Sequence, residues 1–360
     1  MDNRADLDFL REYNDALVVA IARREPTFDR ATVAAGTGLT PQAVSKVIAR
    51  LVEAGLVEPA GLRRQGVGKP ATIYRLIPTS RYAIGAHVAR RTLRLVRTDL
   101  AGEIQESVVR TLPRDFTPDR LLDDLERGVA DMTCTGLVGV GIGMIGPLDV
   151  TNGIVNSHDL QHWHGVPLRD LAATRLGLPV VLDKDVAAGV TAEAWRRGPD
   201  FRDAALVMVE SGIGAGLWLD GTLFRGAHTN AGEFGHTVIE IDGPACVCGR
   251  HGCVEAVHEQ AIAAGDLDRA ARVLAGGVVN LLRTLDLRHV VLAGADLLAH
   301  VDGYRDAVIA AAAGPDWLRV EVTATTMGAD VIAAGAAMQV LNGLYGRPQP
   351  VIARGAWPAT

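Results

Sequence analysis

In the first 78 residues, the pattern of apolar and polar positions predicts short amphipathic helices followed by two strands. A helical pattern runs from residue 9 to about residue 23 and ends before a proline. A second, shorter helix is predicted over 30–36, with Asp29 as its N-cap. Gly38 lies in the turn that follows, where a positive φ is expected. This spacing predicts two helices, the second of which ends in a tight turn that leads into a third helix.

A third helix is predicted after Thr40, which is placed to cap it, with Pro41 at the first helical position. Its apolar residues recur at i, i+3, i+4 and i+7 and form one stripe, consisting of Val44, Val47, Ile48 and Leu51. The side chains left on the outer face are Gln42, Ser45, Lys46 and Arg50. Such side chains can hydrogen-bond base edges and phosphates, which is the task of a recognition helix in the major groove.

A predicted β-hairpin follows this helix. Residues 54–57 lead into one strand, and 72–76 form its antiparallel return. The segment between them carries the cations Arg63, Arg64 and Lys69. Residues 40–75 hold six cations against two carboxylates, in a chain whose net charge is −6. A basic module on an acidic chain favours a winged helix-turn-helix that binds DNA. The alternative is a small helical protein-interaction domain with a solvated cationic loop.

Beyond Arg81, apolar runs of strand length alternate with helical patterns, which predicts an α/β body. Strands are expected at 82–87, 93–99, 137–142, 180–182, 205–209, 217–219 and 290–293. Helices are expected at 117–132, 186–197, 267–285 and 331–344. The stretches 83–102 and 205–221 look alike, which indicates a duplication into two lobes with a cleft between them. We expect a DNA-binding domain over 1–78, a first lobe over 79–185 completed by the helix 331–344, and a second lobe over 186–330.

Composition places this chain among cytoplasmic proteins. Its 360 residues are enough for two or three domains, and it shows neither an apolar run of 18 residues nor a signal peptide. We therefore expect no membrane association. Reduced thiols in that compartment suit metal ligation better than disulfide formation.

Three of the four cysteines cluster in the spacing C-x-C-x4-C, ten residues after a histidine. The set predicts a closed, structural Zn²⁺ site with the ligands His236, Cys246, Cys248 and Cys253. Glu233 and Glu255 flank it and are candidates for binding sugar hydroxyls. The alternative is four unrelated buried residues.

Residues 232–236, Gly-Glu-Phe-Gly-His, followed by the cysteine motif and Glu255, resemble the signature of the ROK family of bacterial repressors and sugar kinases. Further matching stretches are 141–149, 163–168, 183–185 and 211–216. The resemblance implies an actin/hexokinase-like body of two lobes. Together with the N-terminal module, it points to the repressor branch, in the manner of xylose and N-acetylglucosamine repressors.

The family's kinases carry an Asp-x-Gly-Gly-Thr phosphate loop where this chain has residues 87–91, His-Val-Ala-Arg-Arg. The second phosphate loop would begin Gly-Thr-Gly but begins with Glu210, and the adenine-side Gly-Gly is replaced within 293–296. Glycines there let backbone amides approach phosphates, and the aspartate helps to place Mg²⁺. We therefore expect no ATP binding and no enzymatic activity.

The resemblance also implies sugar-contacting residues, which match Asp185, Glu233, His236 and Glu255. The family's asparagine before the aspartate is Lys184 here. An ammonium at this position could recruit a phosphorylated or acidic sugar. Alternatively, Lys184 pairs with Asp183, Asp185 or Glu255 in a pocket that has lost its ligand.

The sequence thus predicts a regulator, commonly a repressor, that binds operator DNA as a homodimer or tetramer and senses a sugar or sugar-derived effector. Two alternatives remain open. One is a sugar kinase with an appended DNA-binding domain, and the other is an effector-independent DNA-binding regulator with a vestigial pocket.

Overall fold

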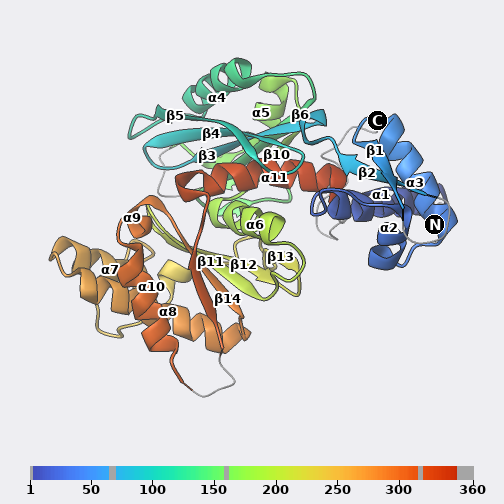
Figure 1. Ribbon diagram of the computed structural model, residues 1–360. Helices are drawn as coiled ribbons and strands as arrows, with labels where there is room; N and C mark the ends of the chain where they lie inside the picture. The colour runs from blue at the N-terminus through green and yellow to red at the C-terminus, as the bar shows by residue number, and fades with distance from the viewer. Residues whose placement is uncertain (1–2, 65–69, 158–161, 315–318, 347–360) are drawn as a thin grey trace.

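An N-terminal module and two α/β lobes make up the computed structural model, which describes residues 3–64, 70–157, 162–314 and 319–346, with side chains from residue 10 onward (Figure 1). In Figure 1 the module lies to one side, beside the C-terminal end of helix α11. Lys69, at the predicted wing tip, lies outside the described residues.

The module contains three helices and one hairpin. Its elements are α1 (Asn3–Ala22), α2 (Arg30–Thr37), α3 (Pro41–Glu53), β1 (Val57–Arg63) and β2 (Ala71–Leu76), with β1 and β2 antiparallel. Asp29 Oδ1 accepts the amide of Thr32 at 2.8 Å, and Thr40 Oγ1 accepts that of Ala43 at 3.3 Å. Gly38 has φ of 71°. Both predicted caps, the left-handed glycine and the helix-turn-helix order are therefore confirmed.

The first lobe is built on a five-stranded sheet in the order β10-β6-β3-β4-β5. Its elements are a short 3₁₀ turn η1 (Pro78–Ser80), β3 (Tyr82–Val88), β4 (Thr92–Asp99), β5 (Ile104–Thr111), α4 (Pro118–Met132), β6 (Leu137–Met144), β7 (Leu148–Asp149), β8 (Ile154–Asn156), β9 (His164–Val166), α5 (Leu168–Leu176) and β10 (Val180–Lys184). Strands β7, β8 and β9 form a separate small sheet.

The second lobe repeats this plan with the sheet order β13-β12-β11-β14-β15. Its elements are α6 (Asp185–Arg197), β11 (Ala204–Val209), β12 (Ile213–Leu219), β13 (Thr222–Phe224), η2 (Phe234–His236), α7 (Val254–Ala263), α8 (Leu267–Leu285), β14 (His289–Ala293), α9 (Ala295–Leu298), α10 (Val301–Ala312) and β15 (Glu321–Ala324). The chain ends its described part with η3 (Gly328–Asp330) and α11 (Val331–Tyr345). In each sheet the central strand, β3 or β11, pairs in parallel with one neighbour and antiparallel with the other. The predicted duplication is confirmed by this shared topology.

Helices α6 and α11 lie side by side between the two sheets (Figure 1). Their contact is close because it uses small residues: a Cβ on Gly335 would lie 1.8 Å from the carbonyl oxygen of Ala188. At its C-terminal end α11 contributes Ala337, Val340 and Leu341 to the core of the N-terminal module. Among the described residues, no helix has the length and apolar character needed to cross a bilayer.

Candidate effector pocket and metal centre

A cavity of about 110 Å³ lies between the two lobes. The first lobe contributes the β3–β4 turn, residues 145–147 after β6, and the junction between β10 and α6. The second contributes residues 208, 210–214, 232–233, 236 and 255. The expected cleft is therefore present, and the effector residues predicted from the sequence all line it, namely Lys184, Asp185, Glu233, His236 and Glu255.

Lys184 pairs with Glu233 across this cavity. The Lys184 side chain is only 6% exposed, and its Nζ lies 2.5 Å from Glu233 Oε1 and 3.3 Å from the carbonyl oxygen of Ala231. The alternative in which Lys184 pairs with Asp183, Asp185 or Glu255 did not include Glu233, which is its ion-pair partner. Asp183 is instead bonded by Arg225 at 2.7 Å, and Glu255 accepts the amide of Ile213 at 2.7 Å. Lys184 thus neutralises a carboxylate that the family resemblance assigns to the ligand.

Arg225 and Gln339 are site residues that the sequence analysis missed. Gln339 Nε2 donates to Asp183 Oδ2 at 2.9 Å, and Arg225 donates to the same oxygen. These bonds hold the residue before Lys184 rigidly in place. No sequence signal indicates them, because Gln339 lies 156 positions from Asp183.

Asp185 is the first residue of α6 and is buried at the cavity wall. Burial raises the pKa of its carboxyl group to about 6, against an opposing effect of the neighbouring Lys184 ammonium. Its Oδ1 accepts the amide of Val186 at 2.7 Å, at the positive end of the helix. A carboxyl group with this pKa can hydrogen-bond a hydroxyl in either protonation state.

The side of the cavity near His87 and Glu210, which the family resemblance matches to phosphate loops, has different chemistry. We call it the phosphate end. Burial, followed by the nearby Arg94, lowers the pKa of His87 to about 4, so the imidazole is neutral at pH 7. Arg90 Nε donates to the carbonyl oxygen of Ser211 at 3.2 Å and so joins the two loops directly. Burial, and then Asp296, raise the pKa of Glu210. A half-buried acid and an arginine thus occupy the two loops that the family resemblance matches to phosphate loops.

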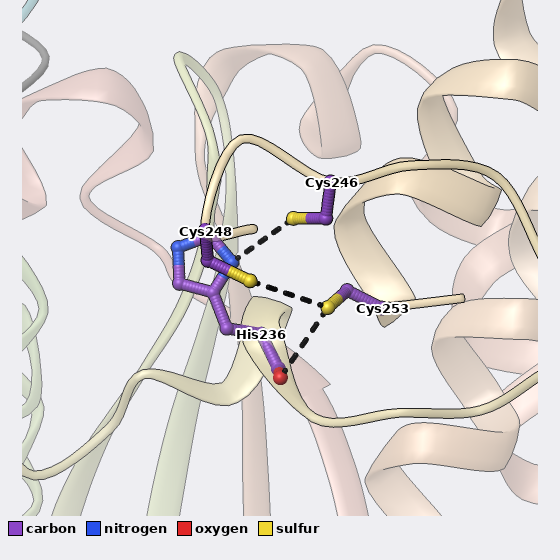
Figure 2. A group of neighbouring side chains, drawn as sticks. All are labelled: His236, Cys246, Cys248 and Cys253. Carbon is purple, nitrogen blue, oxygen red and sulfur yellow. Dashed lines mark hydrogen bonds between the residues drawn. The ribbon is translucent and has the colours of Figure 1, made fainter. Parts of the chain in front are cut away.

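The metal-ligand candidates converge beside the pocket (Figure 2). Their four ligand atoms all lie within 4.8 Å of one another. Cys246 Sγ is 3.5 Å from His236 Nδ1, and the sulfurs of Cys248 and Cys253 are 3.6 Å apart. A tetrahedral zinc with bonds of about 2.3 Å sets its sulfur ligands about 3.8 Å apart. Three thiols and one imidazole at this spacing fit Zn²⁺.

The backbone around this cluster is shaped by a glycine. Gly252 has φ of 67°, and a Cβ there would lie 1.4 Å from the carbonyl oxygen of Glu240. The same tight turn brings Cys253 back against residue 238. His236 Nε2 lies 3.9 Å from Glu233 Oε2, so the cluster touches the pocket through one residue. His251, between Cys248 and Cys253, is exposed and does not belong to the converging set.

The predicted DNA-contacting residues are placed in different ways. Gln42, Lys46 and Arg64 are exposed, whereas Ser45 donates to the carbonyl oxygen of Pro41 at 2.9 Å. Two cations have partners inside the module. Arg50 forms an ion pair with Asp15 of α1. Arg63 lies 3.7 Å from Asp29 and hydrogen-bonds Thr27. Arg50 is thus half-exposed and paired with a carboxylate of α1 that the pattern of α3 could not reveal, and its contact with DNA stays a prediction.

The sequence of this chain is similar to those of known repressors and sugar kinases. The chain is 28% identical over 253 residues to the xylose repressor of Caldicellulosiruptor bescii, an alignment that covers 68% of this chain and 63% of the relative. It is 36% identical over 182 residues to the glucokinase of Thermotoga maritima, covering 46% of this chain and 57% of the relative. The chain thus spans less than two thirds of the length of these relatives.

The fold is shared with a crystal structure described as a ROK family transcriptional regulator and homologue of the E. coli Mlc protein. The TM-score is 0.75 at 18% identity, covering 94% of this chain and 98% of the other. The sequence profile described as "ROK family" matches residues 83–266, about half of the chain. With its duplicated lobes and its histidine–cysteine cluster, this chain belongs to the ROK family.

Proposed function

We propose that this chain is a DNA-binding transcriptional regulator, a repressor, that acts in the cytoplasm and senses a sugar or sugar-derived effector. The observation that carries the proposal is the joining of two parts. A helix-turn-helix module presents Gln42 and Lys46 on an exposed helix face, and a kinase-like body holds Arg90 and Glu210 in its phosphate loops. The xylose repressor among the relatives supports the same assignment.

The proposed function includes a division of the chain into three domains. Residues 1–78 form the DNA-binding domain, 79–185 with the helix 331–344 form the first lobe, and 186–330 form the second lobe. The chain assembles as a homodimer or tetramer, so that two modules bind the half-sites of a palindromic operator.

The effector enters the cavity and is bound by Asp185, Glu233, His236 and Glu255, with Lys184 fixing the orientation of Glu233. Zn²⁺ held by the cluster in Figure 2 stabilises the segment that carries Glu233 and Glu255. When bound, the ion supplies structural rigidity, since four protein ligands leave no open coordination position. An effector that binds one lobe arrangement more tightly than another shifts the modules between arrangements.

A sugar kinase is the second candidate, favoured by the glucokinase relative and by the retained Asp185. Phosphoryl transfer depends on positioning and charge stabilisation of the phosphates. Glu210, an acidic residue, lines the cavity where that stabilisation is required. We therefore rank this candidate below the regulator.

The proposal is tested by selecting bound sequences from a random DNA library with the full chain and measuring their affinity by fluorescence anisotropy. Lys46→Ala is expected to weaken binding and to lower the salt slope by about one, because one phosphate contact is lost. Arg283→Ala, which removes an exposed cation on α8, serves as the matched control and leaves both unchanged. Failure of the wild type to enrich any sequence contradicts the proposal.

A further inference from the structure

The N-terminal module meets the body at a contact between Arg23 and Trp195. The guanidinium carbon of Arg23 lies 3.2 Å from the centroid of the indole ring, and its Nη2 donates to the carbonyl oxygen of Trp195 at 3.1 Å. The indole Nε1 donates to the carbonyl oxygen of Ala101 at 3.3 Å. A Cβ on Gly102 would lie 2.6 Å from the ring. Trp195 is therefore held by the body and covered by the module.

This contact lies at the edge of a buried apolar cluster, and both of its side chains are half-buried. The surrounding cluster joins residues of α1, including Val18, Val19 and Ala22, to the C-terminal end of α11. Burial lowers the pKa of Arg23 to about 9, and its Nε has no hydrogen-bond partner among the described residues. Cation–π attraction is stronger when the cation is desolvated. The guanidinium thus makes a cation–π contact and one hydrogen bond to Trp195 at a half-buried junction.

Trp195 and the effector pocket are on the same helix. Asp185 is the first residue of α6, and Trp195 lies ten positions later in its last turn, about 15 Å along the axis. All ten residues from 185 to 194 are buried. The helix lies between the sheet of the second lobe and α11 (Figure 1). A helix packed this closely moves as a unit, because interiors are dense and do not deform continuously.

We propose that Arg23 and Trp195 are positioning residues, which fix the DNA-binding module to the far end of α6 so that displacement of α6 at the pocket turns the module. This inference rests on the proposed regulatory function. Neither residue touches the ligand, and each acts through the helix that begins at Asp185.

The first test uses hydrogen exchange of the full chain without ligand. Arg23→Gln raises exchange of amides 16–25 about tenfold by undocking the end of α1, while exchange in α3 stays unchanged. Arg24→Gln, which alters the exposed neighbour, is the matched control and has no effect. Arg23→Lys gives an intermediate result, because an ammonium keeps the charge but not the planar stack. Equal loss of protection in α3 and α1 means a general stability role and overturns the proposal.

Coupling to the pocket is tested by adding Asp185→Asn, which removes the charge at the start of α6. It changes exchange of amides 16–25 about threefold in the wild-type background, and has no such effect when Arg23→Gln is present. An effect of the same size in both backgrounds overturns the proposal.

The second test measures affinity for the selected DNA with D-xylose, D-glucose and N-acetyl-D-glucosamine as probes. Arg23→Gln keeps the sugar-free affinity within about threefold, since the DNA face is intact, but loses most of the sugar-induced change. A full sugar response in Arg23→Gln overturns the proposal. A wild type that binds no DNA or responds to no sugar contradicts the proposed function instead, and the exchange experiments then decide the role of Arg23 and Trp195 alone.

Discussion

The two ends of the interlobe cavity have opposite chemistry although they share one fold. At the sugar end, Glu233, Glu255 and Asp185 offer carboxyl groups suited to hydroxyls. At the phosphate end, His87 is buried and neutral, and Arg90 bridges to the facing loop. A hydroxyl needs only a well-placed acceptor, whereas a triphosphate needs glycine amides and a metal ion. This contrast supports the proposal that the cleft has lost the means of phosphoryl transfer and has kept a set of groups for binding sugar.

Removing one metal ligand is expected to have the largest effect. It destabilises the segment that carries Glu233 and Glu255 at the sugar end and leaves the phosphate end unchanged. Cys248 is exposed, so Cys248→Ser removes a ligand without opening a core cavity. Loss of zinc is expected to cost several kcal/mol, lowering the melting temperature by about 10 °C. Metal analysis and thermal unfolding check this, with Cys134→Ser, the cysteine outside the cluster, as control. Equal zinc content in the two variants contradicts the assignment.

The next prediction concerns Asp185 at the sugar end. Its pKa is raised to about 6 in the folded state, so the folded chain holds a proton that the unfolded chain releases between about pH 4 and pH 6. This carboxyl group therefore lowers stability as pH rises through that window, by up to about 3 kcal/mol. Asp185→Asn removes the dependence. Denaturant unfolding at pH 5 and pH 7 should show the variant gaining stability relative to wild type at the higher pH, and a gain at pH 5 instead is the contrary result.

The pH dependence of stability expected from His87, at the phosphate end, has the opposite sign. Its pKa is lowered to about 4, so the unfolded chain binds a proton between about pH 6.5 and pH 4 that the folded chain does not. Stability from this group is complete above that window and is lost as pH falls, by up to about 3 kcal/mol. His87→Gln should reduce the loss of stability between pH 7 and pH 5 in the same unfolding experiment. An unchanged pH profile would show that the imidazole is solvated.

A smaller effect is expected from single carboxylates in binding. Glu233→Gln should weaken sugar binding about tenfold, since it removes an ionised acceptor and leaves Lys184 without its partner. Glu210→Gln, at the phosphate end, should leave sugar affinity unchanged. Calorimetric titration of both variants separates the ends, and equal weakening would mean that the cavity acts as one undivided site.

Elements with strong local signals were predictable from the sequence. Helix α8 occupies the predicted residues 267–285, because a long apolar stripe follows a capping residue, Asp266, which accepts the amide of Arg269. Helix α5 was missed, since only Leu168 and Ala172 of its nine residues are buried. Strand β5 was missed as well, because no residue of it is fully buried and its sequence is largely polar.

The composition of the pocket was predictable, but its pairings were not. The family motif indicates which side chains line the cavity, because each motif lies at a strand end or turn. Lys184 pairs with Glu233, which lies 49 positions away in the sequence. Arg50 pairs with Asp15, which lies 35 positions away. Such choices depend on the distance between elements after packing, which no local pattern encodes.

The central claim is that this cleft binds a sugar to control DNA binding and does not transfer phosphate. The most direct measurement titrates the complex of full chain and selected DNA with neutral, amino, acidic and phosphorylated sugars, each with and without Mg-ATP, while anisotropy and ADP release are followed together. At least one sugar is expected to change DNA affinity, equally with and without Mg-ATP, and no ADP is expected to form. Sugar-dependent ADP release, with DNA affinity unaffected by every sugar, would contradict it.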